Sequence, residues 1–82
     1  MMKLSIRKSA IKDLKRIARK EREVIHTRIL ELAKFPNLSN IKKLTNFEPA
    51  YRLRIGQYRV LFDVVGDTIE IGRVLHRRES YR

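Results

Sequence analysis

Hydrophobic and polar residues alternate through the second half of the chain, from Tyr51 to His76. A period of two is typical of strands that bury one face and leave the other open. The dipeptides Gly56-Gln57 and Gly66-Asp67 interrupt the alternation. Glycine at the first position of a two-residue loop favours a tight hairpin turn. The pattern therefore predicts three consecutive antiparallel strands joined by two short turns.

Two-residue turns also fix which residues of neighbouring strands face each other. The expected pairs across the first turn are Ile55–Tyr58, Arg54–Arg59, Leu53–Val60 and Arg52–Leu61, and those across the second are Val64–Ile69, Asp63–Glu70, Phe62–Ile71, Leu61–Gly72 and Arg59–Val74. This register gives one apolar face. The other face carries Arg52, Arg54 and Arg59, with His76 and Arg78 at its end.

Arg73 does not fit this alternation, because its position in the register places it on the apolar face beside Val60. Three explanations are open. Its long stem can carry the charged head to an edge of the sheet, it can pair with a helix carboxylate such as Glu31, or it can mark a β-bulge.

The first half of the chain predicts one strand and two helices. Leu4 and Ile6 share a face of a short strand from Lys3 to Arg7. Apolar residues then recur at helical spacing, first in a helix with Ser9 as its N-cap and then in a helix that starts near Glu21 and ends before Pro36. Residues 36–49 are expected to form a loop in which Ile41, Leu44 and Phe47 contact the edge of the core.

The expected order is β-α-α-β-β-β, a small α+β fold in which a two-helix hairpin packs on an antiparallel sheet. Residues 1–82 are expected to form a single domain, since a chain of this length supports one hydrophobic core.

Charge narrows the set of partners. Twenty lysines and arginines against nine acids give a net charge of +11, which favours RNA, DNA, an acidic protein or an anionic membrane. The chain has no cysteine and two histidines far apart in sequence, so no metal site or cofactor is expected. It has no apolar run long enough to cross a membrane and no signal peptide, and the cytoplasm is the expected location.

The arginines at the predicted register are not explained by stability. Like charges directly opposite each other destabilise a sheet by about 0.2–1 kcal/mol per pair, so Arg54 beside Arg59 favours a polyanion lying across the sheet. The alternative is an ordinary solvated sheet face, although such a face usually mixes both signs of charge. Lys42 and Lys43 are expected to extend the basic surface.

Arginine, histidine and tyrosine together suit the cleavage of RNA without a metal ion. That reaction needs an aligned 2′-hydroxyl, proton transfer to and from oxygen, and stabilisation of the extra charge on the phosphorane. Arginine suits the last task because its charge is permanent and its fork is rigid. His76 and Tyr81 are the main candidates for proton transfer, and Glu48 and Glu79 are further ones.

The element order, the run YRLRIGQYRVLFDV from Tyr51 to Val64 and the ending HRRESYR resemble the RelE/ParE toxin superfamily over nearly the whole chain. The resemblance is nearest to the RelE branch, whose members are metal-independent ribonucleases that cut mRNA in the ribosomal A site. It implies a type II toxin–antitoxin toxin with a cognate antitoxin, mRNA on the ribosome and contacts to 16S rRNA as partners.

The resemblance also implies roles for single residues. Arg52 and Arg54 match a basic pair on the family's second strand, Arg59 matches an arginine that starts the third, and Arg78 and Tyr81 match an arginine and a tyrosine after the last strand. With His76, the expected catalytic set is Arg54, Arg59, His76, Arg78 and Tyr81, and the expected RNA-binding set is Lys42, Lys43, Arg52, Arg54 and Arg77.

This sequence departs from the family pattern in three ways. Arginine replaces the lysine that is frequent on the second strand, which favours charge stabilisation there. Tyr81 lies only three residues after Arg78, and the C-terminal helix that some members add is not expected.

Two other functions are open. The ParE branch shares the fold and acts by binding DNA gyrase, but generally lacks this set of arginines and tyrosine. A plain RNA-binding module would stack Tyr81 on a base without cleavage.

Overall fold

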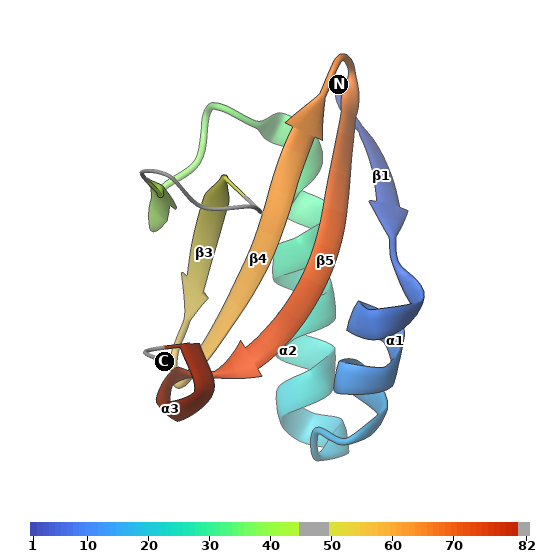
Figure 1. Ribbon diagram of the computed structural model, residues 1–82, viewed down its shortest axis with the longest axis vertical. Coiled ribbons are helices and arrows are strands. Elements are labelled where there is room, and N and C mark those ends of the chain that lie inside the picture. Colours follow the sequence, from blue (N-terminus) through green and yellow to red (C-terminus); the bar gives the residue numbers. More distant parts are fainter. Residues whose placement is uncertain (45–49, 81–82) are drawn as a thin grey trace.

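A five-stranded sheet runs through the computed structural model, which describes residues 1–44 and 50–80 (Figure 1). The strands are β1 (Lys3–Ile6), β2 (Ile41–Lys43), β3 (Tyr51–Ile55), β4 (Tyr58–Val65) and β5 (Thr68–His76), in the order β1-β5-β4-β3-β2. The predicted meander of β3, β4 and β5 is confirmed. The sheet as a whole is mixed, because β1 runs parallel to β5.

The segment expected to be a loop contributes the edge strand β2, which pairs antiparallel with β3. Alternation alone did not reveal it, since the strand is only three residues long and carries two lysines. Ile41 and Leu44 are half-buried, as expected for the edge of a core. Phe47 lies outside the described residues.

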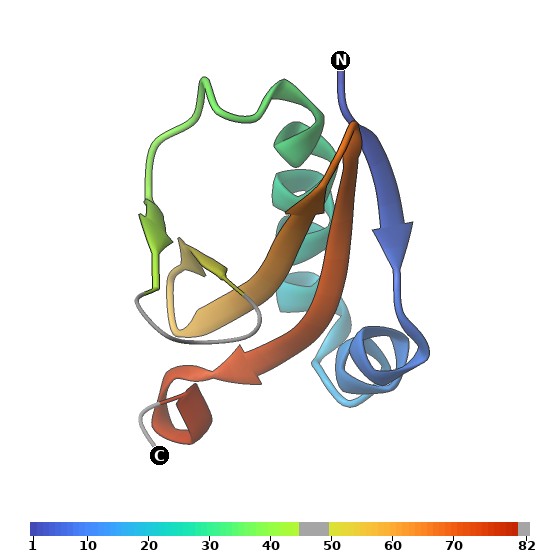
Figure 2. The same ribbon diagram turned by 45° about the horizontal axis from the view of Figure 1, so that its top comes forward.

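Helix α1 (Lys8–Lys15) and helix α2 (Arg19–Glu31) precede a short 3-10 turn, η1 (Leu32–Lys34). Helix α2 covers one face of the sheet, and α1 lies beside β5 (Figures 1 and 2). The α+β class is confirmed, with two details corrected. Helix α1 is capped by Arg7 rather than by Ser9, and α2 begins two residues before the expected start at Glu21.

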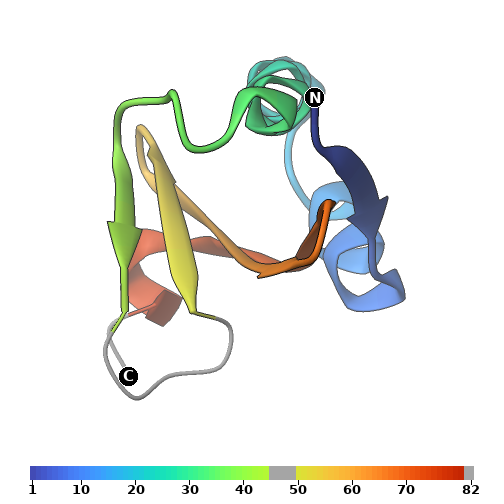
Figure 3. The ribbon, with the colours of Figure 1, turned by 90° about the horizontal axis from the view of Figure 1, so that it is seen from above.

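A one-turn helix, α3 (Arg77–Ser80), follows β5, although no C-terminal helix was expected. It lies on the side of the sheet away from α2 (Figure 3). None of the helices in the described residues is both long and apolar enough to cross a membrane.

The hydrophobic core lies between α2 and the sheet. Its fully buried members from the helical side are Ile25, Ile29 and Leu32, and those from the strands are Leu53, Val60, Phe62, Ile69 and Ile71. The Tyr51 and Phe62 rings stack with centroids 5.4 Å apart. Phe35 meets both rings edge-on, at 5.2 Å from Tyr51 and 6.0 Å from Phe62. Such aromatic pairs add about 0.5–1.5 kcal/mol each beyond the area they bury.

A β-bulge in β5 changes the register of its last third. The predicted pairs hold across the first turn and as far as Phe62–Ile71 across the second. Beyond that point Leu61 pairs with Arg73 rather than Gly72, so Gly72 is the extra residue. One extra residue reverses the face of every later side chain. The bulge explains why Arg73 did not fit the alternation.

The reversal overturns two further expectations. Arg59 faces Leu75 instead of Val74, and Val74 enters the core with 3% of its surface exposed. His76 pairs with Tyr58 and therefore lies on the face that α2 covers. The prediction that His76 stands at the end of the arginine face is wrong for this reason.

Candidate nucleic-acid interface

The face of the sheet away from α2 carries basic residues in rows across neighbouring strands. Directly paired residues of antiparallel strands point to the same face. Lys42 of β2 pairs with Arg52 of β3, and Arg54 of β3 pairs with Arg59 of β4. We call these four residues the basic face. Lys43 pairs with Tyr51 and so belongs to the opposite face, which separates it from Lys42.

The charges of the basic face have no acidic partner among the described residues. The ion pairs among the described residues are Lys3–Asp67, Arg7–Glu70, Arg19–Glu23, Arg28–Glu31 and Arg73–Asp13. None of them includes a residue of the basic face or Arg78. Arg54 is exposed and Arg52 is half-buried. Unneutralised charge on one face creates a positive potential that attracts anions.

Arg59 is placed differently from its neighbours, because only 6% of its surface is exposed. Its Nη1 donates hydrogen bonds to the carbonyl oxygens of Gly56 and Tyr58, both at 2.9 Å. Its buried Nε has no hydrogen-bond partner among the described residues. A buried polar group without a partner costs about 1–3 kcal/mol. Arg59 therefore holds the turn between β3 and β4 with a donor left unsatisfied.

Helix α3 brings two more arginines to this end of the molecule. The Arg77 backbone N–H donates to the Gln57 carbonyl at 2.6 Å, which ties the start of α3 to the β3–β4 turn that Arg59 also contacts. Arg77 and Arg78 are both exposed. The start of α3, and with it the backbone of Arg78, therefore lies near the β3–β4 turn at the end of the basic face. Tyr81 and Glu48 lie outside the described residues.

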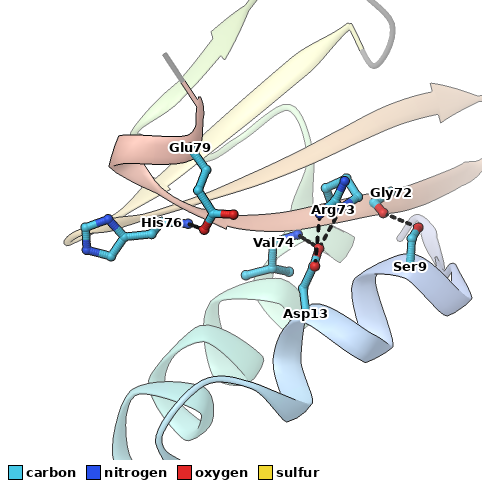
Figure 4. Close-up of polar contacts among 7 residues, drawn as sticks. All are labelled: Ser9, Asp13, Gly72, Arg73, Val74, His76 and Glu79. Atoms are coloured by element: carbon cyan, nitrogen blue, oxygen red, sulfur yellow. Dashed lines mark hydrogen bonds and ion pairs between the residues drawn. The ribbon is translucent and has the colours of Figure 1, made fainter. Parts of the chain in front are cut away.

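His76 supports the turn into α3. Its backbone N–H donates to Glu79 Oε1, and its Nδ1 accepts the Arg78 N–H, each at 3.3 Å (Figure 4). His76 Nδ1 thus serves as the acceptor for the second residue of α3. The ring meets Tyr58 edge-on at 5.4 Å. His76 is therefore not brought together with Arg54 and Arg59.

A small polar cavity of about 160 Å³ lies where His76, Tyr58 and Glu79 face α1. Burial is the largest cause that raises the pKa of Tyr58 above its ordinary value, followed by the charge of Glu21, a hydrogen bond to Glu21 and the charge of Glu79. The phenol therefore stays protonated and serves as a donor. In residues 1–44 and 50–80, no three His, Cys, Asp or Glu side chains are grouped so as to hold a metal ion.

Contacts between α1 and β5 were not predicted. The Ser9 hydroxyl donates to the Gly72 carbonyl at 2.6 Å, and the Val74 N–H donates to Asp13 Oδ2 at 2.9 Å (Figure 4). Arg73 pairs with Asp13 and not with Glu31. The available signal was that Asp13 is the only acid of α1 and follows Ser9 by one helical turn.

Comparison with known proteins agrees with this geometry. Residues 4–81 match the family of ParE toxins of type II toxin–antitoxin (parDE) systems. Toxin RelE3 of Methanocaldococcus jannaschii is 38% identical over an alignment of 84 residues. The alignment covers 98% of this chain and 96% of that protein.

Two solved structures are similar over nearly the whole chain. A chain of the RelB-RelE antitoxin-toxin complex from Methanococcus jannaschii has a TM-score of 0.79 and 38% identity, covering 94% of each chain. A chain of the toxin-antitoxin complex RelBE2 from Mycobacterium tuberculosis has a TM-score of 0.79 and 26% identity, covering 93% of this chain and 98% of its own.

The fold and the comparisons together define a small toxin-type α+β protein, whose basic face has no acidic partner in residues 1–44 and 50–80. The chain belongs to the RelE/ParE superfamily of type II toxin–antitoxin toxins, and within it to the RelE-like branch.

Proposed function

We propose that the protein is a toxin that cleaves mRNA without a metal ion, in the A site of the ribosome. The observation that carries this proposal is the basic face, whose arginines have no acidic partner in the described part of the chain. Arginine binds phosphate through a planar fork and keeps its charge at every physiological pH. A cluster of such groups on one sheet face suits the backbone of RNA, including nearby 16S rRNA.

The proposed reaction is an in-line displacement at phosphorus. The 2′-oxygen loses its proton and bonds to phosphorus, the bond to the 5′-oxygen breaks, and that oxygen takes up a proton. The products carry a 2′,3′-cyclic phosphate and a 5′-hydroxyl. Arg54 and Arg78, both exposed, stabilise the added negative charge of the phosphorane. Arg52, Arg77 and Lys42 hold flanking phosphates.

Proton transfer needs a group other than arginine, since a guanidinium is a poor acid or base. His76 lies on the other face of β5 and holds the start of α3. We therefore assign the proton-transfer or base-stacking role to Tyr81 rather than to His76. Lys43 pairs with Tyr51 and so lies on the opposite face of the sheet from Arg52, and we do not assign it to RNA binding.

We also propose a cognate antitoxin as a partner. Two solved relatives are antitoxin-toxin complexes from Methanococcus jannaschii and Mycobacterium tuberculosis. An antitoxin segment with carboxylates would neutralise part of the +11 charge by covering Arg52 and Arg54. The proposed target and partner both place the protein in the cytoplasm.

A second candidate function is inhibition of DNA gyrase without nuclease activity. The description of the matching family as ParE toxins favours it, as does the Arg59 guanidinium, which contacts its own turn rather than the open face.

Paired variants test the proposal. Arg54→Ala removes an exposed arginine of the basic face, and Arg19→Ala removes an exposed arginine of α2 that pairs with Glu23. Purified ribosomes that carry a defined mRNA are incubated with each variant, and cleavage is followed by primer extension. We expect Arg54→Ala to cut at least about tenfold more slowly, and Arg19→Ala to cut like the wild type. Equal loss in both variants would contradict the assignment, and gyrase inhibition without any cleavage would support the second candidate.

A further inference from the structure

The outer edge of β5 changes its neighbour halfway along the strand. β1 pairs with β5 from Thr68 to Ile71 only, and the Arg7 N–H donates to the Ile71 carbonyl at 2.9 Å where this pairing ends. From Gly72 onward, α1 borders the same edge (Figures 1 and 4). Backbone groups of a strand edge need partners if they are buried. Two side chains of α1 supply them.

Ser9 and Asp13 lie one turn apart on α1, and they bind β5 at Gly72, the extra residue of the bulge, and at Val74, two residues later. Ser9 Oγ donates to the Gly72 carbonyl at 2.6 Å, and the Val74 N–H donates to Asp13 Oδ2 at 2.9 Å. Regular pairing with a strand is thereby replaced by side-chain contacts from a helix. The bulge is held from outside the sheet.

Asp13 also binds the side chain of Arg73, the residue after the extra residue of the bulge. Arg73 donates from Nε to Oδ2 at 2.8 Å and from Nη2 to Oδ1 at 3.2 Å, a two-point contact between guanidinium and carboxylate. The Asp13 side chain is only 11% exposed, whereas that of Arg73 is 48% exposed. The hydrogen bond to Asp13 is the largest cause that raises the pKa of Arg73. One nearly buried carboxylate thus binds backbone and side chain together.

The register that this contact holds decides where α3 begins. In the bulged register Val74 faces Val60 in the core, and Leu75 faces Arg59 on the basic face. Without the extra residue, Val74 would face Arg59, and all later side chains would change face. Arg77, whose N–H binds the Gln57 carbonyl, and Arg78 after it would then no longer start α3 beside the β3–β4 turn.

We propose that Asp13 is a positioning residue for the RNA-cleaving face: by holding the bulge of β5 it sets the place of α3 and Arg78 relative to Arg54. This inference rests on the proposed function. Asp13 itself does not lie on the basic face, and it acts through Val74 and Arg73.

Three variants test this role. Asp13→Ala removes the hydrogen bonds that Asp13 makes with Arg73 and Val74 of β5. Asp13→Asn keeps an oxygen that can accept the Val74 N–H but loses the charge. Asp67→Asn is the matched control, since Asp67 is an exposed aspartate at the opposite end of β5 that pairs with Lys3 at 3.7 Å. Each variant is examined by NMR and by ribosome-dependent cleavage.

The NMR measurement reports the register directly. Contacts between Val60 and Val74 mark the bulged register, and contacts between Arg59 and Val74 mark the regular one. We expect Asp13→Ala to weaken the Val60–Val74 contacts and to lose hydrogen-exchange protection of the Val74 amide. Asp13→Asn should retain much of both, and Asp67→Asn should be unchanged.

The cleavage measurement separates positioning from binding. A displacement of about 1 Å can cost about 100-fold in rate, so we expect kcat to fall about tenfold or more in Asp13→Ala, with KM changed less than about twofold and with partial rescue in Asp13→Asn.

A folded Asp13→Ala protein with the bulged register and a wild-type kcat would overturn the proposal, as would a loss of kcat with the register intact. If Asp13→Ala does not fold, the same comparison between Asp13→Asn and Asp67→Asn decides. If the wild type cuts no RNA, the proposed function fails, and the NMR arm still decides whether Asp13 holds the bulge.

Discussion

Replacing Arg59 by alanine is expected to cost much activity and little stability. The side chain is 6% exposed and donates two hydrogen bonds to carbonyl oxygens of its own turn. It also stands directly opposite Arg54. Its hydrogen bonds and buried stem stabilise the fold, whereas the burial of its charge and the repulsion from Arg54 destabilise it.

Two hydrogen bonds from a charged donor contribute about 1.5–3 kcal/mol each, and the buried stem contributes about 0.8 kcal/mol per methylene. Against these stand the desolvation of a buried cation, which costs several kcal/mol, and the repulsion from Arg54, about 0.2–1 kcal/mol. The unpartnered Nε is part of that desolvation cost. We expect Arg59→Ala to lower the free energy of unfolding by about 2 kcal/mol.

The effect on cleavage should be larger, because Arg59 holds the β3–β4 turn to which the start of α3 is tied, and a displacement of about 1 Å in the groups that contact the phosphate can cost about 100-fold in rate. Urea unfolding gives the first quantity, and single-turnover cleavage on ribosomes gives the second. Arg59→Lys keeps the charge and loses the fork, and it should recover less than a tenth of the lost rate. A folded Arg59→Ala protein that cuts at the wild-type rate would refute the reasoning. A destabilisation above about 4 kcal/mol would show that Arg59 is retained for stability.

Three further outcomes follow from the structure. Phe62→Ala should destabilise the protein by about 3–5 kcal/mol in urea unfolding, because it empties the centre of the core. The pKa of Tyr58 is raised in the fold above its ordinary 10.0, so the stability that its protonated form contributes is present below pH 10 and lost as pH rises through the higher folded value. Unfolding of Tyr58→Phe should therefore depend less on pH above 10 than that of the wild type; an equal dependence would contradict the shift. In stopped-flow mixing with the antitoxin, association should be faster at low salt and dissociation nearly independent of salt, and an association rate indifferent to salt would count against electrostatic masking.

Much of the sheet was predictable because two-residue turns fix strand pairing locally. The pairs from Tyr58 with Ile55 to Leu61 with Arg52 follow from the position of Gly56 alone. Edge strand β2 was missed, since three residues with two lysines carry too little alternation to separate from a loop. The parallel pairing of β1 with β5 was not visible either, because no turn connects those strands.

The candidate site was predictable as far as the bulge. Arg52 and Arg54 lie on the face that the alternation gave them. His76 does not, because the register beyond Gly72 depends on contacts with a carboxylate in α1, far away in sequence. The burial of Arg59 could not be predicted from the sequence either. Alternation gives the face of the sheet on which a side chain lies, but not whether its tip turns back to the backbone.

The chemistry of the product ends tests the central claim most directly. Purified protein is mixed with ribosomes that carry a defined mRNA, and the fragments are treated with polynucleotide kinase in its phosphate-adding and phosphate-removing modes. The reaction is repeated after the free protein has been treated with a chelator. Attack by the 2′-hydroxyl with arginine stabilisation predicts a 2′,3′-cyclic phosphate, a 5′-hydroxyl and unchanged cleavage by the treated protein. A 5′-phosphate product, loss of cleavage after the chelator, or intact mRNA would contradict the account.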